Sequence, residues 1–214
     1  MTSDASSSPG HTLPPFSLRR LERQLAVDAT LRAAVLGLVV AAAVFVFIFE
    51  GGADLWSSLA VMGVFLVWLA MGTVSANVSR KLPRIAALTE ADPAEAEAAI
   101  DDGLRRRALL PWVRLMLYHR LAVLRHRQRR YDEAAAISAA ILPHRLGPGE
   151  GARPHLLLML AESYLQLGQP AAAWWPLHQL YASRLSLVEA LQRLALQTRY
   201  ELLTGQHALA ASNA

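Results

Sequence analysis

The amino-acid sequence predicts an all-α protein in which a transmembrane helical hairpin is followed by a small α-solenoid. Three observations support this prediction. Two apolar stretches, 31–49 and 55–78, have the lengths of membrane-spanning helices. Only five residues join them, so the two helices are expected to run antiparallel. After residue 80 there is no alternation typical of strands, and Ala, Leu, Arg, Glu and Gln dominate.

The two apolar stretches lack the charges that a helix on a protein surface carries. The first contains one charged residue, Arg32 at its start, and the second contains none. A chain of 214 residues has too little surrounding protein to bury two helices that are apolar on every face. A cleaved signal peptide is the alternative for the first stretch, but its apolar run is too long and about thirty residues precede it. We therefore expect both stretches to span a bilayer.

Charge asymmetry predicts the orientation of this hairpin. The connecting turn, 50–54, contains two acidic residues and no Lys or Arg. Basic residues flank the hairpin on its other side: Arg19, Arg20, Arg23, Arg32, Arg80, Lys81 and Arg84. By the positive-inside rule both termini are cytoplasmic and the turn lies outside. The Ala- and Arg-rich composition favours a bacterial inner (plasma) membrane. The lack of ionisable residues deep in either span argues against an ion pathway.

Small residues occur at a spacing of four in both spans, as at Ala33, Gly37 and Ala41. Such residues let helix backbones approach closely. They serve packing within the hairpin or, as the alternative, self-association into a homo-oligomer.

The segments around the hairpin are assigned from composition and capping signals. Residues 1–16 are rich in Ser, Pro and Gly and predict a disordered tail. Residues 17–30 predict an interfacial amphipathic helix, and residues 80–111 a linker helix. Within the linker, Asp92 is expected to cap a helix, with a proline at the first helical position and Glu95 completing a capping box.

Three similar strings follow in the C-terminal half. They begin at Arg129, Gly168 and Gly205, which gives offsets of 39 and 37 residues. Each follows a helical stretch and opens another, a pattern typical of an α-solenoid. Turns are expected near these strings, across the glycine-rich stretch 144–153 and near Ser183.

Residues 112–214 resemble the tetratricopeptide repeat family. The middle unit carries the match through Leu157, Leu160, Ala161, Tyr164, Gly168, Ala173, Leu177 and Leu180. The first unit supplies Tyr118, Leu121, Ala122, Tyr131, Ala134 and Ile141. Two charged residues depart from the pattern, because Arg125 and Glu201 occupy places where the family has apolar residues. The third unit is therefore expected to be a polar cap or a shortened repeat.

The resemblance implies a concave groove that binds a peptide of a protein partner. Carried over by position, its lining is Met116, His119, Val123, His126, Arg127, His155, Leu158, Glu162, Leu165 and Gln166. The histidine, arginine and glutamine groups suit acidic side chains of a partner. The alternative is that this face is only the wet side of the bundle. Trp174 and Trp175 are candidate docking aromatics, of which one is expected to face the core.

Catalytic and metal-binding patterns are missing from the sequence. It contains no cysteine, no glycine-rich phosphate loop, no H-E-x-x-H and no nucleophile elbow. His119 and His126 share a helix face, but a metal site would need further ligands. We therefore predict a protein that is not an enzyme and has no cofactor.

The arginines between residues 120 and 130 form a basic cluster in the sequence. It is interpreted as a site for nucleic acid, a site for anionic lipid, or a solvated helix face. From residue 85 onward, however, 14 Lys and Arg face 12 Asp and Glu, which argues against nucleic acid.

Together these observations predict a membrane-anchored adaptor that recruits a protein partner at the cytoplasmic membrane face. A structural subunit of a larger membrane complex is the main alternative. A membrane tether for nucleic acid or anionic lipid, through the basic cluster at 120–130, is the third interpretation.

Overall fold

The computed structural model describes residues 17–49, 55–105 and 111–205, apart from some side chains between residues 32 and 78. All regular structure in these ranges is helical, with no strand, so the all-α prediction is confirmed. The helices are α1 (Leu18–Phe49), α2 (Leu55–Ala91), α3 (Pro93–Arg105), α4 (Pro111–Arg127), α5 (Tyr131–Ile141), α6 (Arg153–Gln166), α7 (Pro170–Tyr181) and α8 (Leu187–Leu203), with the short 3-10 helix η1 (Gly147–Ala152). The expected tail 1–16 and turn 50–54 lie outside the described residues.

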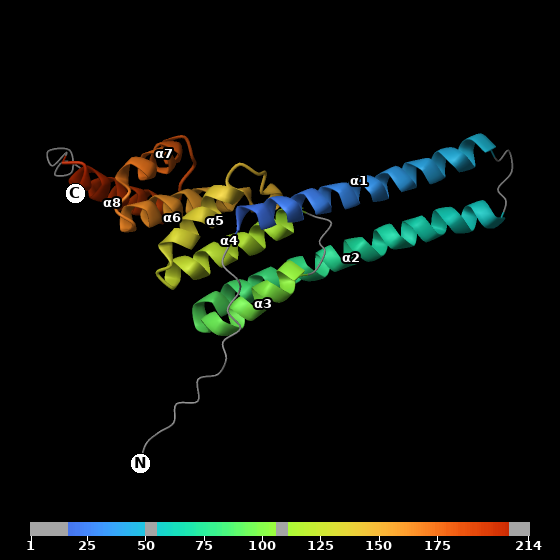
Figure 1. Ribbon diagram of the computed structural model, residues 1–214, viewed down its shortest axis with the longest axis horizontal. Helices are drawn as coiled ribbons and strands as arrows, with labels where there is room; N and C mark the ends of the chain where they lie inside the picture. The colour runs from blue at the N-terminus through green and yellow to red at the C-terminus, as the bar shows by residue number, and fades with distance from the viewer. Residues whose placement is uncertain (1–16, 50–54, 106–110, 206–214) are drawn as a thin grey trace, which may run out of the picture.

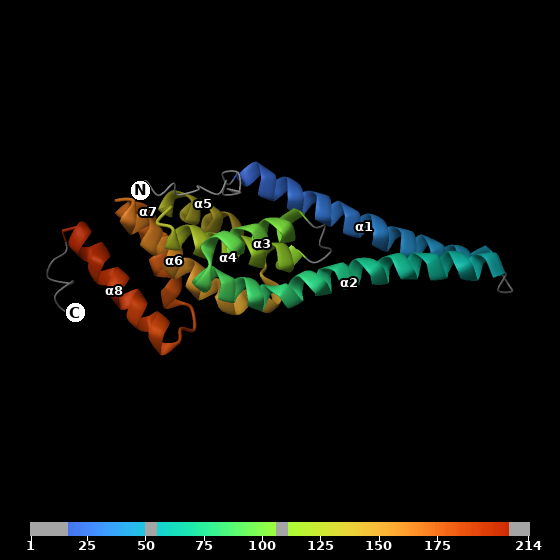
Figure 2. The ribbon, with the colours of Figure 1, turned by 90° about the horizontal axis from the view of Figure 1, so that it is seen from below.

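The molecule is elongated, with a helical domain at one end and two long helices projecting from it (Figure 1). α1 runs away from the domain and α2 returns toward it, so the two are antiparallel neighbours. α3 to α8 gather at the domain end, as the view from below also shows (Figure 2).

The helix boundaries around the apolar stretches differ from those expected. α1 continues from Leu18 to Phe49 without a break between the segments 17–30 and 31–49. No Gly or Pro stands near that boundary to interrupt it. Two leucines of the segment 17–30, Leu21 and Leu25, pack on the helical domain, and Leu21 is only 1% exposed. This part of α1 is therefore a packed element of the domain.

α2 likewise extends well past the expected end of the second span. It continues through Pro83 to Ala91, so the linker segment 80–111 begins inside α2. Ile85 and Thr89 on this extension are buried, because α3 and α4 pack against it. The linker is thus divided between the end of α2 and α3, and its residues 106–110 lie outside the described part of the chain.

The start of α3 confirms half of the expected capping box. The Asp92 Oδ1 accepts hydrogen bonds from the backbone N–H groups of Ala94 and Glu95, at 2.9 and 3.2 Å. The backbone N–H of Asp92 donates to the Leu88 carbonyl instead of to Glu95. The Glu95 carboxylate lies 3.6 Å from the Arg84 guanidinium on α2. It therefore links two helices rather than closing the cap.

α4 to α8 are joined by turns where local signals predict them. α4 and α5 pack as one pair, α6 and α7 as a second, and α8 packs on α6 and α7. Gly168 has φ +68° in the turn between α6 and α7, a left-handed conformation that glycine adopts without strain. The helices of each pair approach closely because the residues at their crossings are small and fully buried: Ala122, Ala134, Ala161 and Ala173.

The length and composition of α1 are compatible with a membrane-spanning helix. Among the described residues, one helical stretch, Arg19–Ala41, is long and apolar enough to cross a membrane by length and composition. The expected second span lies within α2, where many side chains are outside the described residues. Large apolar side chains that are described, such as Leu36 and Phe65, are 63% and 54% exposed.

Candidate partner-binding surface

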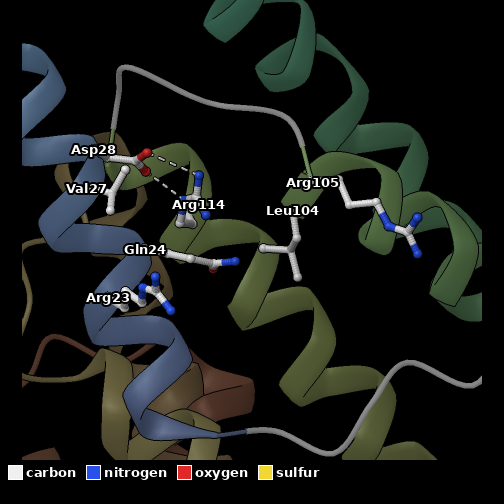
Figure 3. Close-up of a pocket in the computed structure, with 7 residues that line it drawn as sticks. All are labelled: Arg23, Gln24, Val27, Asp28, Leu104, Arg105 and Arg114. Atoms are coloured by element: carbon white, nitrogen blue, oxygen red, sulfur yellow. Dashed lines mark hydrogen bonds and ion pairs between the residues drawn. The ribbon is translucent and has the colours of Figure 1, made fainter.

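The helical domain is fixed to α1 by a buried polar junction. The Arg114 guanidinium of α4 faces the Asp28 carboxylate of α1, with Nε 2.7 Å from Oδ2 and Nη2 donating to Oδ1 at 3.2 Å (Figure 3). Both side chains are almost fully buried. One α-helical turn away from Asp28, the Tyr118 hydroxyl donates to the Gln24 side chain at 2.8 Å. These contacts set the position of α4, and with it the surface that α4 presents.

A small cavity of about 240 Å³ lies beside this junction, between α1, α3 and α4. Arg23, Leu104 and Arg105 line it together with the buried pair (Figure 3). The Arg105 side chain points away from Asp28 and pairs with Asp101. The cavity therefore borders the buried polar junction between α1 and α4.

A second buried cluster fixes α4 to α3 and α5. Arg125 is 2% exposed, and its Nη1 and Nη2 donate to the two carboxylate oxygens of Glu97 at 3.1 and 2.8 Å. Its Nε lies 3.0 Å from a carboxylate oxygen of Glu133. Arg125 stands where the tetratricopeptide repeat has an apolar residue, and two acids on neighbouring helices balance its charge.

The basic cluster expected at residues 120–130 is not a continuous patch. Arg125 is buried in the cluster just described. Arg127 lies 3.2 Å from Glu90, and Arg130 pairs with Glu133. Carboxylates from α2, α3 and α5 thus face three arginines of this segment, Arg125, Arg127 and Arg130.

The face shared by α4 and α6 carries the histidines expected in the groove. We call it the α4–α6 surface and define it by His119, Arg120, His126, His155 and Glu162. The His119 Nε2 lies 3.3 Å from the His155 Nδ1, so one ring donates to the other. The His126 Nε2 lies 3.5 Å from the Glu162 carboxylate. Two pairs of polar side chains therefore bridge the two helices.

These histidines are poor bases in the folded protein. Burial, with smaller contributions from the charges of His155 and Arg120, lowers the pKa of His119 to about 3. Burial of the ring and the Arg120 charge also lower the pKa of His155, although that residue as a whole is exposed. Burial lowers the pKa of His126, against the opposing effect of Glu162. The α4–α6 surface therefore presents neutral imidazole rings at neutral pH.

Several residues expected to line the groove are part of the core instead. Leu158 is fully buried and Leu165 is 2% exposed, so neither can contact a partner without rearrangement. His119 is also buried, at 3% exposure. The reason is that α4 and α6 pack on helices on several sides, which covers residues that the resemblance places on an open face. Solvent still reaches a set of the expected residues, partly or largely: Met116, Val123, His126, Arg127, His155, Glu162 and Gln166.

The paired tryptophans also differ from expectation. Trp174 and Trp175 are 53% and 52% exposed, so neither is the core residue that one of them was expected to be. The Trp174 ring stacks on His178, with ring centroids 5.7 Å apart, and lies equally close to the Tyr200 ring of α8. Trp174 thus forms one wall of a cavity between α7 and α8.

This cavity contains functional candidates that the sequence patterns did not single out. It measures about 430 Å³, and its lining includes Trp174, Leu177, Tyr181, Arg193, Tyr200 and Glu201. A spacing signal for it exists, because aromatic rings recur at positions 174, 178 and 181 along one face of α7. We call this cavity the α7–α8 pocket.

The described residues hold no cluster of three or more His, Cys, Asp or Glu that could bind a metal ion. The α4–α6 surface and the α7–α8 pocket offer imidazole, guanidinium, amide and aromatic groups, which suit the binding of a partner by hydrogen bonds and packing. No family model, curated protein or solved structure matches this chain.

Proposed function

We propose that this chain is a membrane-anchored adaptor. In this proposal α1 and α2 form a transmembrane hairpin, and the helical domain recruits a protein partner at the cytoplasmic face. One observation carries the proposal: a folded domain is fixed by buried contacts at the base of two helices, and beyond the domain many of their described large apolar side chains are exposed. Leu36 and Phe65, at 63% and 54% exposed, are examples. Rows of exposed large apolar residues mark a membrane or protein contact.

The repeat-like packing of the domain supports the recruiting role. α4–α5 and α6–α7 are consecutive antiparallel helix pairs with fully buried alanines at their crossings. Stacked pairs of this kind leave an extended face on their first helices. Here that face is the α4–α6 surface, whose uncharged imidazoles and nearby Arg127 can donate hydrogen bonds to a partner's carboxylates.

The membrane topology is tested with single cysteines, which the cysteine-free chain makes simple to introduce. Ala53→Cys lies in the expected outer turn, and Ala182→Cys is exposed in the helical domain. A membrane-impermeant maleimide should label the first in intact cells and the second only after the membrane is opened. Labelling of Ala182→Cys in intact cells would contradict a cytoplasmic domain.

Partner recruitment is tested by crosslinking the full-length protein in its native membrane. A photoreactive amino acid is placed at His126 or Glu162 on the α4–α6 surface, and at the exposed Arg145 on a loop as the control. Mass spectrometry should find one protein that recurs at both surface positions and not at Arg145. Crosslinks only to lipid or to the chain itself would exclude recruitment through this surface.

A permanent subunit of a larger membrane complex is the second candidate function. It is favoured by the exposed apolar residues on α8, where Leu187, Val188 and Leu191 are 78%, 74% and 59% exposed. A helix face of this kind is typical of a lasting contact. The size of the particle extracted in mild detergent separates the two functions, since a stoichiometric assembly supports the subunit and a lone chain supports the adaptor.

A membrane tether for nucleic acid or anionic lipid is not favoured by the described contacts. Its cationic segment, 120–130, is mostly paired with carboxylates. Salt-dependent binding of DNA, RNA or anionic vesicles to the full-length protein would restore this interpretation.

A further inference from the structure

The α7–α8 pocket contains an arginine for which no anionic partner is found among the described residues. The Arg193 guanidinium carbon lies 4.6 Å from the centre of the Tyr181 ring. Its Nε is buried without a hydrogen-bond partner, and so are the Nε atoms of Arg114 and Arg125. The guanidinium groups of Arg114 and Arg125, however, both face carboxylates at 3.0 Å or less, whereas Arg193 faces none among the described residues. A guanidinium without a facing carboxylate can bind an anion from a ligand.

Stacking on Tyr181 fixes the orientation of this guanidinium. An arginine on an aromatic face keeps its N–H groups in the ring plane of the guanidinium free for a planar anion. The Tyr181 hydroxyl in turn donates to the Gln197 side chain, one turn after Arg193 on α8, so α8 contacts the tyrosine at two points. The arginine is therefore positioned before any ligand arrives, which lowers the entropy cost of binding.

Most of the remaining pocket lining is apolar or aromatic, and Gln197 and Glu201 complete it. Its volume of about 430 Å³ accommodates a large side chain, and Trp174, Leu177 and Tyr200 form its walls. Tryptophan, tyrosine and arginine are the residues that most often dominate binding energy at protein interfaces. All three types converge here within one cavity.

We propose that the α7–α8 pocket binds a peptide segment of a partner protein that carries a carboxylate next to an aromatic or large aliphatic side chain. The carboxylate pairs with Arg193, and the apolar side chain lies between Trp174 and Tyr200. Charge complementarity favours this choice, because the Arg193 guanidinium attracts an anion, while the Trp174 and Tyr200 rings beside it suit an apolar side chain.

Glu201 restricts the acidic group to one end of the pocket. It lies eight residues after Arg193 on α8, which separates the two by about 12 Å along the helix. A segment with a single acid fits this arrangement, whereas a polyacidic segment would bring a like charge toward Glu201. The pocket therefore selects against acidic tracts as well as against acid-free peptides.

This inference deepens the proposed adaptor function by naming the chemistry of a partner, and it rests on that function for its biological setting. It uses a different surface from the α4–α6 surface. The two can therefore fail separately: loss of crosslinks at His126 and Glu162 does not affect the pocket, and an inert pocket does not affect those crosslinks.

The test is a selection of random twelve-residue peptides displayed on phage against the full-length protein in nanodiscs. Enriched peptides are then synthesised together with versions in which the acid is replaced by its amide. The expected consensus is one Asp or Glu within about one helical turn of an aromatic or large aliphatic residue. Arg193→Gln and Trp174→Ala should each weaken binding at least tenfold, and Arg145→Gln on an exposed loop should leave it unchanged.

A double-mutant comparison makes the assignment specific. Replacing the peptide acid by its amide should weaken binding to the wild-type protein and have little further effect on Arg193→Gln. The inference is overturned if no peptide is enriched, if enriched peptides lack acids, or if Arg193→Gln binds them as the wild type does. It is also overturned if the protein is a dimer in nanodiscs that Trp174→Ala separates, because a second copy then covers the pocket.

Discussion

The buried cluster around Arg125 allows the sharpest test of what holds the helical domain together. Arg125→Met keeps the length and apolar stem of the side chain and removes its charge. Glu97, which is 7% exposed, and Glu133 then lose the cation that faces them at 2.8 to 3.1 Å. Breaking a buried ion pair from one side costs about 3–5 kcal/mol, because an uncompensated charge stays in a poorly solvated site.

The same helix provides a matched control. Arg127 forms an ion pair with Glu90, but the two side chains are 48% and 71% exposed. Exposed pairs contribute at most about 1 kcal/mol, so Arg127→Met should be nearly neutral. The two variants differ in the burial of the pair and share the substitution, the helix and the type of partner.

The assay is urea unfolding of the full-length protein in mild detergent, followed by tryptophan fluorescence. The free energy of unfolding should fall by about 3–5 kcal/mol in Arg125→Met, a large part of the total for a domain of this size. Adding Glu97→Gln to that variant should recover about 2 kcal/mol, although Glu97→Gln alone should destabilise the wild type. If Arg125→Met costs no more than Arg127→Met, the cluster is not what fixes α4 to α3 and α5.

Three further predictions concern pH, the junction with α1 and a close helix contact. The folded state holds His119 neutral down to a pKa of about 3, so protonation of the unfolded chain lowers stability as the pH falls below about 6.5. By pH 5 this contribution amounts to about 2 kcal/mol, and unfolding at a series of pH values should show a smaller loss in His119→Gln. Arg114→Leu should cost about 3–5 kcal/mol by removing the guanidinium that faces the buried Asp28 carboxylate, and hydrogen exchange in the first four turns of α1 should accelerate. Gly103→Ala should destabilise by about 1–3 kcal/mol in the same urea assay, because its Cβ would lie 2.9 Å from a Leu117 methyl group.

Each of these predictions has a control in the same chain. His178→Gln, at an exposed position, should keep the pH dependence of the wild type, and an equal reduction in both histidine variants would argue against His119. Arg105→Leu breaks an exposed pair and should leave hydrogen exchange in α1 unchanged. Gly63→Ala meets nothing within 4 Å on α2 and should be neutral or stabilising. A stabilising Gly103→Ala would show that Leu117 can move aside.

The parts of the fold that sequence predicts well are those set by local signals. The turn at Gly168 and the N-cap at Asp92 follow from residues within one or two turns of the chain. Buried alanines at 122 and 161 agree with what the resemblance to the tetratricopeptide repeat family implies. These features depend on short-range geometry, and they are visible before the packing of the helices is known.

Features that depend on the packing of distant helices could not be predicted. Arg125 and Glu97 are separated by 28 residues, and nothing in either segment indicates that the other lies beside it. The repeat pattern predicts that Leu158 lines a groove. Its side chain is fully buried instead, because the neighbouring helices pack against it, and that packing cannot be read from the local sequence. The α7–α8 pocket could not be predicted from either helix alone, because Arg193 of α8 gains its role only from its contact with the Tyr181 ring of α7.

The unbroken course of α1 makes the proposed anchor a mechanical element as well as an attachment. A helix of 32 residues is a rod about 48 Å long. In the proposed topology its first 13 residues, about 20 Å, lie with the domain and the remainder lies in lipid. A spanning helix that is longer than the local hydrocarbon core can fit it by tilting, and tilting this rod by about 10° would move its inner end sideways by about 3 Å. A change in the thickness of the surrounding membrane would then turn the recruiting surfaces relative to the bilayer plane, and so change which neighbours they can reach.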